Sequence, residues 1–143
     1  MHLLSAVGLA LFVVTAPVAD YALFARIQPT VRVSTAWIQA PGAGSTEAAA
    51  FVTIDNGTMY DVFIVGAETE MAAIEIRDRP KGGVAAVVVK EVPVPAFGRL
   101  EMSPETVHLR LTALGQPLKP GDIVRLVIYT DGGEQLAASA TVK

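Results

Sequence analysis

The stretch that decides the fold of this chain is Val107-His108-Leu109-Arg110, together with the segment 114–122 (LGQPLKPGD) that follows it. Upstream of it lie residues 74–79 (IEIRDR), a Gly82-Gly83 pair and an apolar run over 84–89. Apolar and polar residues alternate in the segments around 74–79 and 107–111. Such alternation predicts β-strands, and the glycine and proline pairs between them predict turns.

The same alternation of apolar and polar residues, broken by turn residues, extends from residue 28 to the end of the chain, without the periodicity of a helix. We therefore expect one antiparallel domain over residues 28–143, with an all-β fold of the Greek-key sandwich class. Asn56-Gly57 and the segment 119–122 (KPGD) predict turns. The predicted strands cover residues 31–38, 49–55, 61–67, 74–78, 84–90, 99–102, 107–111, 123–130 and 135–142.

Composition excludes several classes of protein. The formal net charge of −3 gives no basic face for a nucleic-acid backbone. The chain has no cysteine, so disulfides, thiolate metal sites, thiol catalysis and lipidation of an N-terminal cysteine are not available to it. The mean hydropathy of +0.47 is high for a soluble domain, and the N-terminal segment accounts for much of it.

Residues 3–25 form an apolar segment that is long enough to cross a membrane. At about 1.5 Å per residue, the segment matches a hydrocarbon core of about 30 Å. A secretory signal peptide is the alternative, but no Lys or Arg precedes the apolar run, and Pro17 stands where it disfavours cleavage after Ala16 or Ala19. We therefore expect residues 1–27 to be a retained anchor, with one transmembrane helix preceding the β domain.

The order of these segments resembles the PCu(A)C family of periplasmic copper chaperones. That family has a His-x-Met on one strand, a Met on the next, a second His-x-Met, and then a Gly-Leu-x-x-Pro-Leu-x-x-Gly-Asp-like turn. The resemblance covers residues 35–142 and implies a cupredoxin-like sandwich. It also implies a bacterial periplasmic domain, which the apolar segment 3–25 would hold on the inner membrane as a single span with the C-terminal domain in the periplasm.

The resemblance implies a copper site from which most ligands are gone. It places the first His on Arg77, its Met on Arg79, the lone Met near Val87, the second His on His108, and the last Met on Arg110. Soft thioethers and imidazoles suit Cu(I), whereas a guanidinium has no lone pair to donate and stays charged. We therefore expect no cofactor and a copper site that has been lost.

Two further interpretations concern the remaining polar groups. His108 and Met102 lie on adjacent predicted strands and are weak candidates for a metal site, and a buried histidine and a core methionine are the favoured explanation. Arg77, Arg79, Lys81 and Arg110 predict a basic rim that would bind an acidic partner, a lipid headgroup or a small anion. A charged rim that prevents edge-to-edge pairing of sheets is the alternative.

No motif of an enzyme is present. The histidines are His2 and His108 alone, which is too few for a histidine triad or a metal trio. Asn56-Gly57-Thr58 also matches a glycosylation sequon, but the turn explains it.

The resulting hypothesis is a non-catalytic, membrane-anchored accessory subunit of a larger bacterial electron-transfer complex, respiratory or photosynthetic. The protein partners would be subunits of that complex, and the resemblance alone suggests this host. The alternatives are a periplasmic copper chaperone with a remodelled site, and a free periplasmic module that binds an anion or an acidic peptide.

Overall fold

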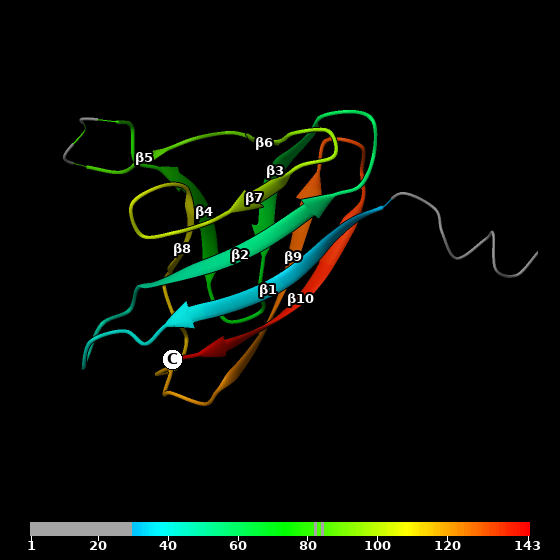
Figure 1. Ribbon diagram of the computed structural model, residues 1–143. Helices are drawn as coiled ribbons and strands as arrows, with labels where there is room; N and C mark the ends of the chain where they lie inside the picture. The colour runs from blue at the N-terminus through cyan, green and yellow to red at the C-terminus, as the bar shows by residue number, and fades with distance from the viewer. Residues whose placement is uncertain (1–29, 82, 84) are drawn as a thin grey trace, which may run out of the picture.

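The computed structural model describes residues 30–81, 83 and 85–143. Through this part the chain is all-β, as predicted (Figure 1). The strands are β1 (Val31–Gln39), β2 (Ala48–Asn56), β3 (Val62–Glu68), β4 (Ala73–Asp78), β5 (Val87–Val88), β6 (Val92–Val94), β7 (Arg99–Glu101), β8 (His108–Thr112), β9 (Ile123–Thr130) and β10 (Gln135–Val142).

The strands form one hydrogen-bonded sheet that curls on itself, which is consistent with the expected cupredoxin-like fold. Its order is β5-β4-β8-β2-β1-β10-β9-β3-β6, and β7 also pairs with β2. The curl brings β3 against β4, and β6 against β2 and β7 (Figure 1). Register shifts between Val33 and Thr35 in β1 and between Ile64 and Gly66 in β3 mark bulges or irregularities. A bulge increases local bending, which helps one sheet to wrap round a core.

A row of apolar side chains crosses the sheet on its inner face. Cross-strand pairing joins Ile76 to Leu109, Leu109 to Ala50, Ala50 to Ile38, and Ile38 to Val142. All five residues are buried in the hydrophobic core. Burial of each Ile or Leu contributes about 1.5–3 kcal/mol. This row fixes the register of β4, β8 and β2, because a slip of one residue would turn its members outward.

The sequence prediction was wrong in one region. A strand was expected over residues 84–90, but β5 is only Val87–Val88, and β6 at Val92–Val94 was not predicted. Both are edge strands, with single partners in β4 and β3. Pro93 in β6 is tolerated because an edge strand leaves one row of backbone groups unpaired.

The turn at Asn56-Gly57 is built from the asparagine side chain. Neither residue has a positive φ, which was the conformation expected from this pair. Asn56 is buried, and its Nδ2 donates to the carbonyl oxygens of Tyr60 and Val94 at 2.8 and 3.0 Å. Its Oδ1 accepts from the backbone N–H of Thr58 at 2.9 Å. These bonds explain the residue without a glycan.

Over the described residues, the structure has no helix long and apolar enough to span a membrane. The anchor predicted for residues 1–27 lies outside the described residues.

Candidate functional site

The register of β4, β8 and β2 brings the predicted site residues together on the outer face of the sheet. Arg77 on β4 lies opposite His108 on β8, and Glu75 lies opposite Arg110. Ala49 on β2 lies opposite Arg110 from the other side. Cross-strand partners project to the same face, so these side chains are neighbours there. Their sequence neighbours Ile76, Leu109 and Leu111 point into the core.

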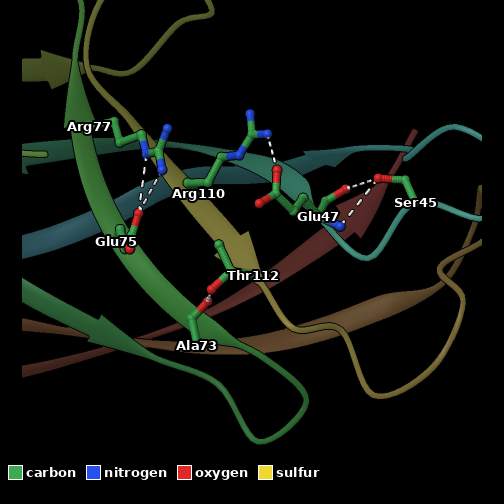
Figure 2. A network of polar contacts seen from close by, with 7 residues as sticks. All are labelled: Ser45, Glu47, Ala73, Glu75, Arg77, Arg110 and Thr112. Atoms are coloured by element: carbon green, nitrogen blue, oxygen red, sulfur yellow. Dashed lines mark hydrogen bonds and ion pairs between the residues drawn. The ribbon is translucent and has the colours of Figure 1, made fainter. Parts of the chain in front are cut away.

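Two ion pairs occupy this face (Figure 2). Arg77 Nε and Nη2 donate to Glu75 Oε2 at 3.2 and 2.9 Å. Arg110 Nη2 donates to Glu47 Oε2. The Arg110 guanidinium also lowers the pKa of the Glu47 carboxyl through this hydrogen bond and through its charge. Arg77 and Arg110, two of the three arginines expected to form a basic rim, are therefore paired with carboxylates of their own chain.

His108 is buried and lies at the end of an aromatic row. Its ring centroid is 6.1 Å from that of Phe51, which lies 4.6 Å from that of Trp37. Lys143 Nζ is 5.7 Å from the centroid of the Trp37 ring. At this distance the lysine makes a cation–π contact that closes the row.

The imidazole of His108 is neutral at neutral pH. Burial lowers its pKa, and the charges of Arg110, Arg77 and Arg79 lower it further against the opposing effect of the Thr106 carbonyl. His108 Nδ1 lies 3.4 Å from the Thr106 carbonyl oxygen. A carbonyl only accepts hydrogen bonds, so this contact places the proton on Nδ1 and leaves the lone pair on Nε2.

The other predicted residues make no ion pair within this cluster. Arg79 and Lys81 follow β4 and are exposed, with no ion pair to another residue that the structure describes. In β5, Val88 lies opposite Arg77, and Val87 lies opposite Asp78. The residue that shares a face with Arg77 and His108 is therefore Val88, whereas the sequence alignment placed the lone Met of the family near Val87.

Met102 packs in the hydrophobic core, and its backbone N–H donates to the Val52 carbonyl oxygen at 3.1 Å. Among the residues that the structure describes, no three His, Cys, Asp or Glu side chains gather in a group that could hold a metal ion. The cluster instead offers guanidinium donors, two carboxylates and one neutral imidazole. Such a set holds strands together and recognises hydrogen-bond acceptors, and it is a poor match for a soft cation.

Sequence reasoning missed Glu47 and Glu75. Glu75 had a signal, because it stands two residues before Arg77 and so shares a face of the same strand. Glu47 had none, because its approach to Arg110 depends on the pairing of β2 with β8.

This fold and this arrangement of β4, β5 and β8 define a PCuAC-like domain, and solved structures agree. The Cu(I)-bound DR1885 of Deinococcus radiodurans is 30% identical, with a TM-score of 0.69 over 86% of this chain and 85% of that one. The copper-bound PCuAC domain from PmoF2 is 15% identical, with a TM-score of 0.68 over 81% of this chain and 95% of that domain, which shows the fold alone.

Comparison of sequences leads to one family. Residues 31–142 match the family described as "Putative lipoprotein LpqE-like". A curated relative, described as a "Putative lipoprotein" of Leifsonia xyli subsp. xyli (strain CTCB07), is 29% identical over 119 residues, which are 79% of this chain and 69% of that protein. The chain belongs to the LpqE-like family, and its predicted likeness to the PCu(A)C proteins is confirmed.

Proposed function

We propose that this protein is a non-catalytic accessory subunit whose PCuAC-like domain is anchored outside the cytoplasm and has exchanged its copper ligands for ion pairs. The single observation that carries the proposal is the pairing of Arg77 with Glu75 and of Arg110 with Glu47, beside a neutral His108. Where the family pattern has a His and a Met, the chain has two arginines, each with its own carboxylate. Such pairs offer no soft donor atom to a soft cation, and they stabilise the outer face of the sheet.

Membrane attachment is the second part of the proposal. The family and the Leifsonia relative are described as lipoproteins. These 143 residues contain no cysteine that could carry a lipid. The apolar segment 3–25 supplies the attachment instead, as a single span that places residues 28–143 on the periplasmic face of a bacterial inner membrane.

The partners that we propose are subunits of a larger electron-transfer complex of that membrane, respiratory or photosynthetic. Arg79 and Lys81 support a docking role, since both are exposed beside β4 and have no ion pair with a described residue. Their charges suit an acidic surface on a partner subunit.

Copper titration against a competing Cu(I) chelator tests the loss of the metal site. We expect the wild-type chain to leave Cu(I) with the chelator. A variant with Arg77→His, Arg79→Met, Val88→Met and Arg110→Met restores the family's donor types around His108, and we expect its Cu(I) affinity to rise at least 100-fold. The matched control carries Val87→Met in place of Val88→Met, which puts the thioether on the other face of β5.

The opposite results would support the remodelled chaperone. If the wild type competed for Cu(I) and His108→Ala removed that ability, the proposal of a lost site would be wrong.

Co-purification tests the accessory role. Native membranes solubilised in a mild detergent should yield this chain in a large complex, and Arg79→Glu with Lys81→Glu should release it. Elution of the wild type as a free monomer would contradict the proposal.

A further inference from the structure

Three large apolar side chains are exposed together at the end of the sheet where β1 begins. The exposed fractions of Met59, Tyr60 and Phe97 are 64%, 71% and 75%. Met59 and Tyr60 lie in the β2–β3 loop, and Phe97 lies in the β6–β7 loop (Figure 1). We call these three residues the apolar tip.

The two loops are tied to each other by hydrogen bonds. The Phe97 N–H donates to the Thr58 carbonyl oxygen at 3.0 Å, and the Ala96 N–H donates to Asp61 Oδ1 at 2.9 Å. The buried Asn56 side chain donates to the Tyr60 carbonyl oxygen at 2.8 Å. The apolar tip is therefore held on a braced scaffold, and its side chains are presented outward together.

Phe97 takes a backbone conformation that is unusual for its type. Its φ is +52°, in the left-handed region that Gly or Asn adopts at lower cost. A large exposed aromatic side chain in a strained position is not explained by packing of the domain. Strain of this kind points to a function for the side chain itself.

The chain enters the domain beside the apolar tip. Thr30 is the first described residue, and its carbonyl oxygen accepts from the Gly57 N–H at 3.0 Å, next to the loop that carries Met59 and Tyr60. Only residues 26–29 separate Thr30 from the apolar segment 3–25. Five residue steps reach at most about 17 Å when fully extended.

We propose that the apolar tip docks on the lipid bilayer in which the segment 3–25 is anchored, with Met59, Tyr60 and Phe97 at the level of the headgroups. The inference rests on the anchor of the proposed function. Tyr and Phe side chains favour this interfacial depth because an apolar ring meets a hydrated boundary there.

The charges near the apolar tip indicate that apolar contact, rather than attraction to anionic lipid, dominates the docking. Arg99 Nε donates to Asp55 Oδ1 at 2.6 Å, and the exposed Arg32 lies opposite the same carboxylate on β1, so positive and negative charges stand side by side at this end of the sheet. Asp61 is exposed and adds a negative charge to the loop. We therefore expect docking on zwitterionic and on anionic vesicles alike.

The absence of native cysteine allows a direct measurement of depth. The full-length chain, with Met59→Cys or Phe97→Cys, is labelled with a nitroxide and reconstituted in phosphatidylcholine vesicles with and without phosphatidylglycerol. The matched control is Ile123→Cys, an equally apolar site with 68% exposure near the end of β1 that lies away from Thr30. The far-ultraviolet circular dichroism spectrum verifies the fold of each variant.

Oxygen partitions into lipid and a charged nickel complex into water, so their relative collision rates report depth. We expect oxygen to exceed nickel severalfold at Met59→Cys and Phe97→Cys, and the reverse at Ile123→Cys. Adding Tyr60→Ser and Phe97→Ser to the Met59→Cys chain should move its label toward water.

Two contrary outcomes are distinguishable. If the chain floats with the vesicles but the labels at positions 59 and 97 read as water-exposed, like position 123, docking of the tip is overturned and the anchor stands. If the chain does not float with vesicles, the anchor of the proposed function fails, and docking beside it fails too.

Discussion

At the scale of single residues, the outer face of β4 and β8 shows how a ligand position is converted to a structural one. Arg110 is held by the Glu47 carboxylate, and Arg77 by Glu75. These two substitutions away from the family pattern are thus each matched by a carboxylate from the same chain. Reversal of one arginine alone leaves a glutamate without its partner, so the restoration of a metal site needs several changes at once.

Removal of the Glu47 charge tests this pairing through its dependence on pH. The pKa of Glu47 is lowered from its ordinary value of 4.5 by the hydrogen bond and charge of Arg110. Its contribution to the free energy of unfolding is therefore fully present above that ordinary value and is lost as the pH falls through the lowered one. We expect Glu47→Gln to lower the urea midpoint at pH 7 and to have a smaller effect at pH 2.5.

Glu70→Gln is the control for that experiment, since Glu70 is an exposed carboxylate of the β3–β4 loop. It should leave the midpoint unchanged at both pH values. An equal loss for Glu47→Gln at pH 7 and pH 2.5 would show that the pair with Arg110 does not stabilise the fold.

His108 offers a second measurement at this scale. Burial is the largest cause of its lowered pKa, followed among the lowering effects by the charge of Arg110. We expect the ring proton resonances to titrate below the ordinary value of 6.5. Arg110→Met should raise the pKa of His108 without bringing it to that ordinary value, because burial remains. A pKa that does not respond to Arg110→Met would mean that the two side chains are too well screened to interact.

At the scale of elements, the loops at one end of the sheet depend on a single buried amide. Asn56→Ala removes the donors to Tyr60 and Val94 and the acceptor of Thr58, and it leaves the Val94 carbonyl buried without this partner. We expect a loss of about 3 kcal/mol in the free energy of unfolding. Urea denaturation followed by Trp37 fluorescence gives the value. The exposed amide change Gln116→Ala should stay within about 0.5 kcal/mol.

The success of the sequence prediction also varies by element. Strands with clear alternation, such as β1, β9 and β10, were predicted to within one residue at each end. The apolar run at 84–90 gave too long a predicted strand, because its apolar residues do not mark a buried strand. Val88, for example, is exposed on a short edge strand. Because of Pro93, β6 was not predicted, since a proline argues against a strand unless the strand lies at an edge.

The candidate site was predictable only in part. Its strands and the neighbourhood of Arg77, His108 and Arg110 followed from the family pattern. The carboxylate partners did not, because the contact of Glu47 with Arg110 joins residues far apart in the sequence through the register of β2 with β8. The choice between Val87 and Val88 likewise needed the register of β5 with β4.

At the scale of the whole molecule, the curled sheet is a complete folding unit. The core residues lie between Val31 and Val142, and β1 and β10, the first and last strands of the chain, pair with each other in the middle of the sheet. We therefore expect a chain that begins at Thr30 to fold cooperatively, with the same urea midpoint as the full-length chain in detergent. Fractionation of cells should find this shortened chain in the soluble fraction and the full-length chain in the membrane fraction. Recovery of both in the soluble fraction would refute the anchor.

The parallel pairing of β1 with β10 determines how the domain would respond to a pull between its two ends. Because both strands run the same way, Thr30 lies at one end of the sheet, and Lys143 lies beside Ile38 and Ala40 at the other (Figure 1). A pull between the membrane at the first end and a partner at the second would load β1 and β10 in shear. Hydrogen bonds loaded in shear break together rather than one at a time, so the pairing of β1 with β10 would resist such a pull.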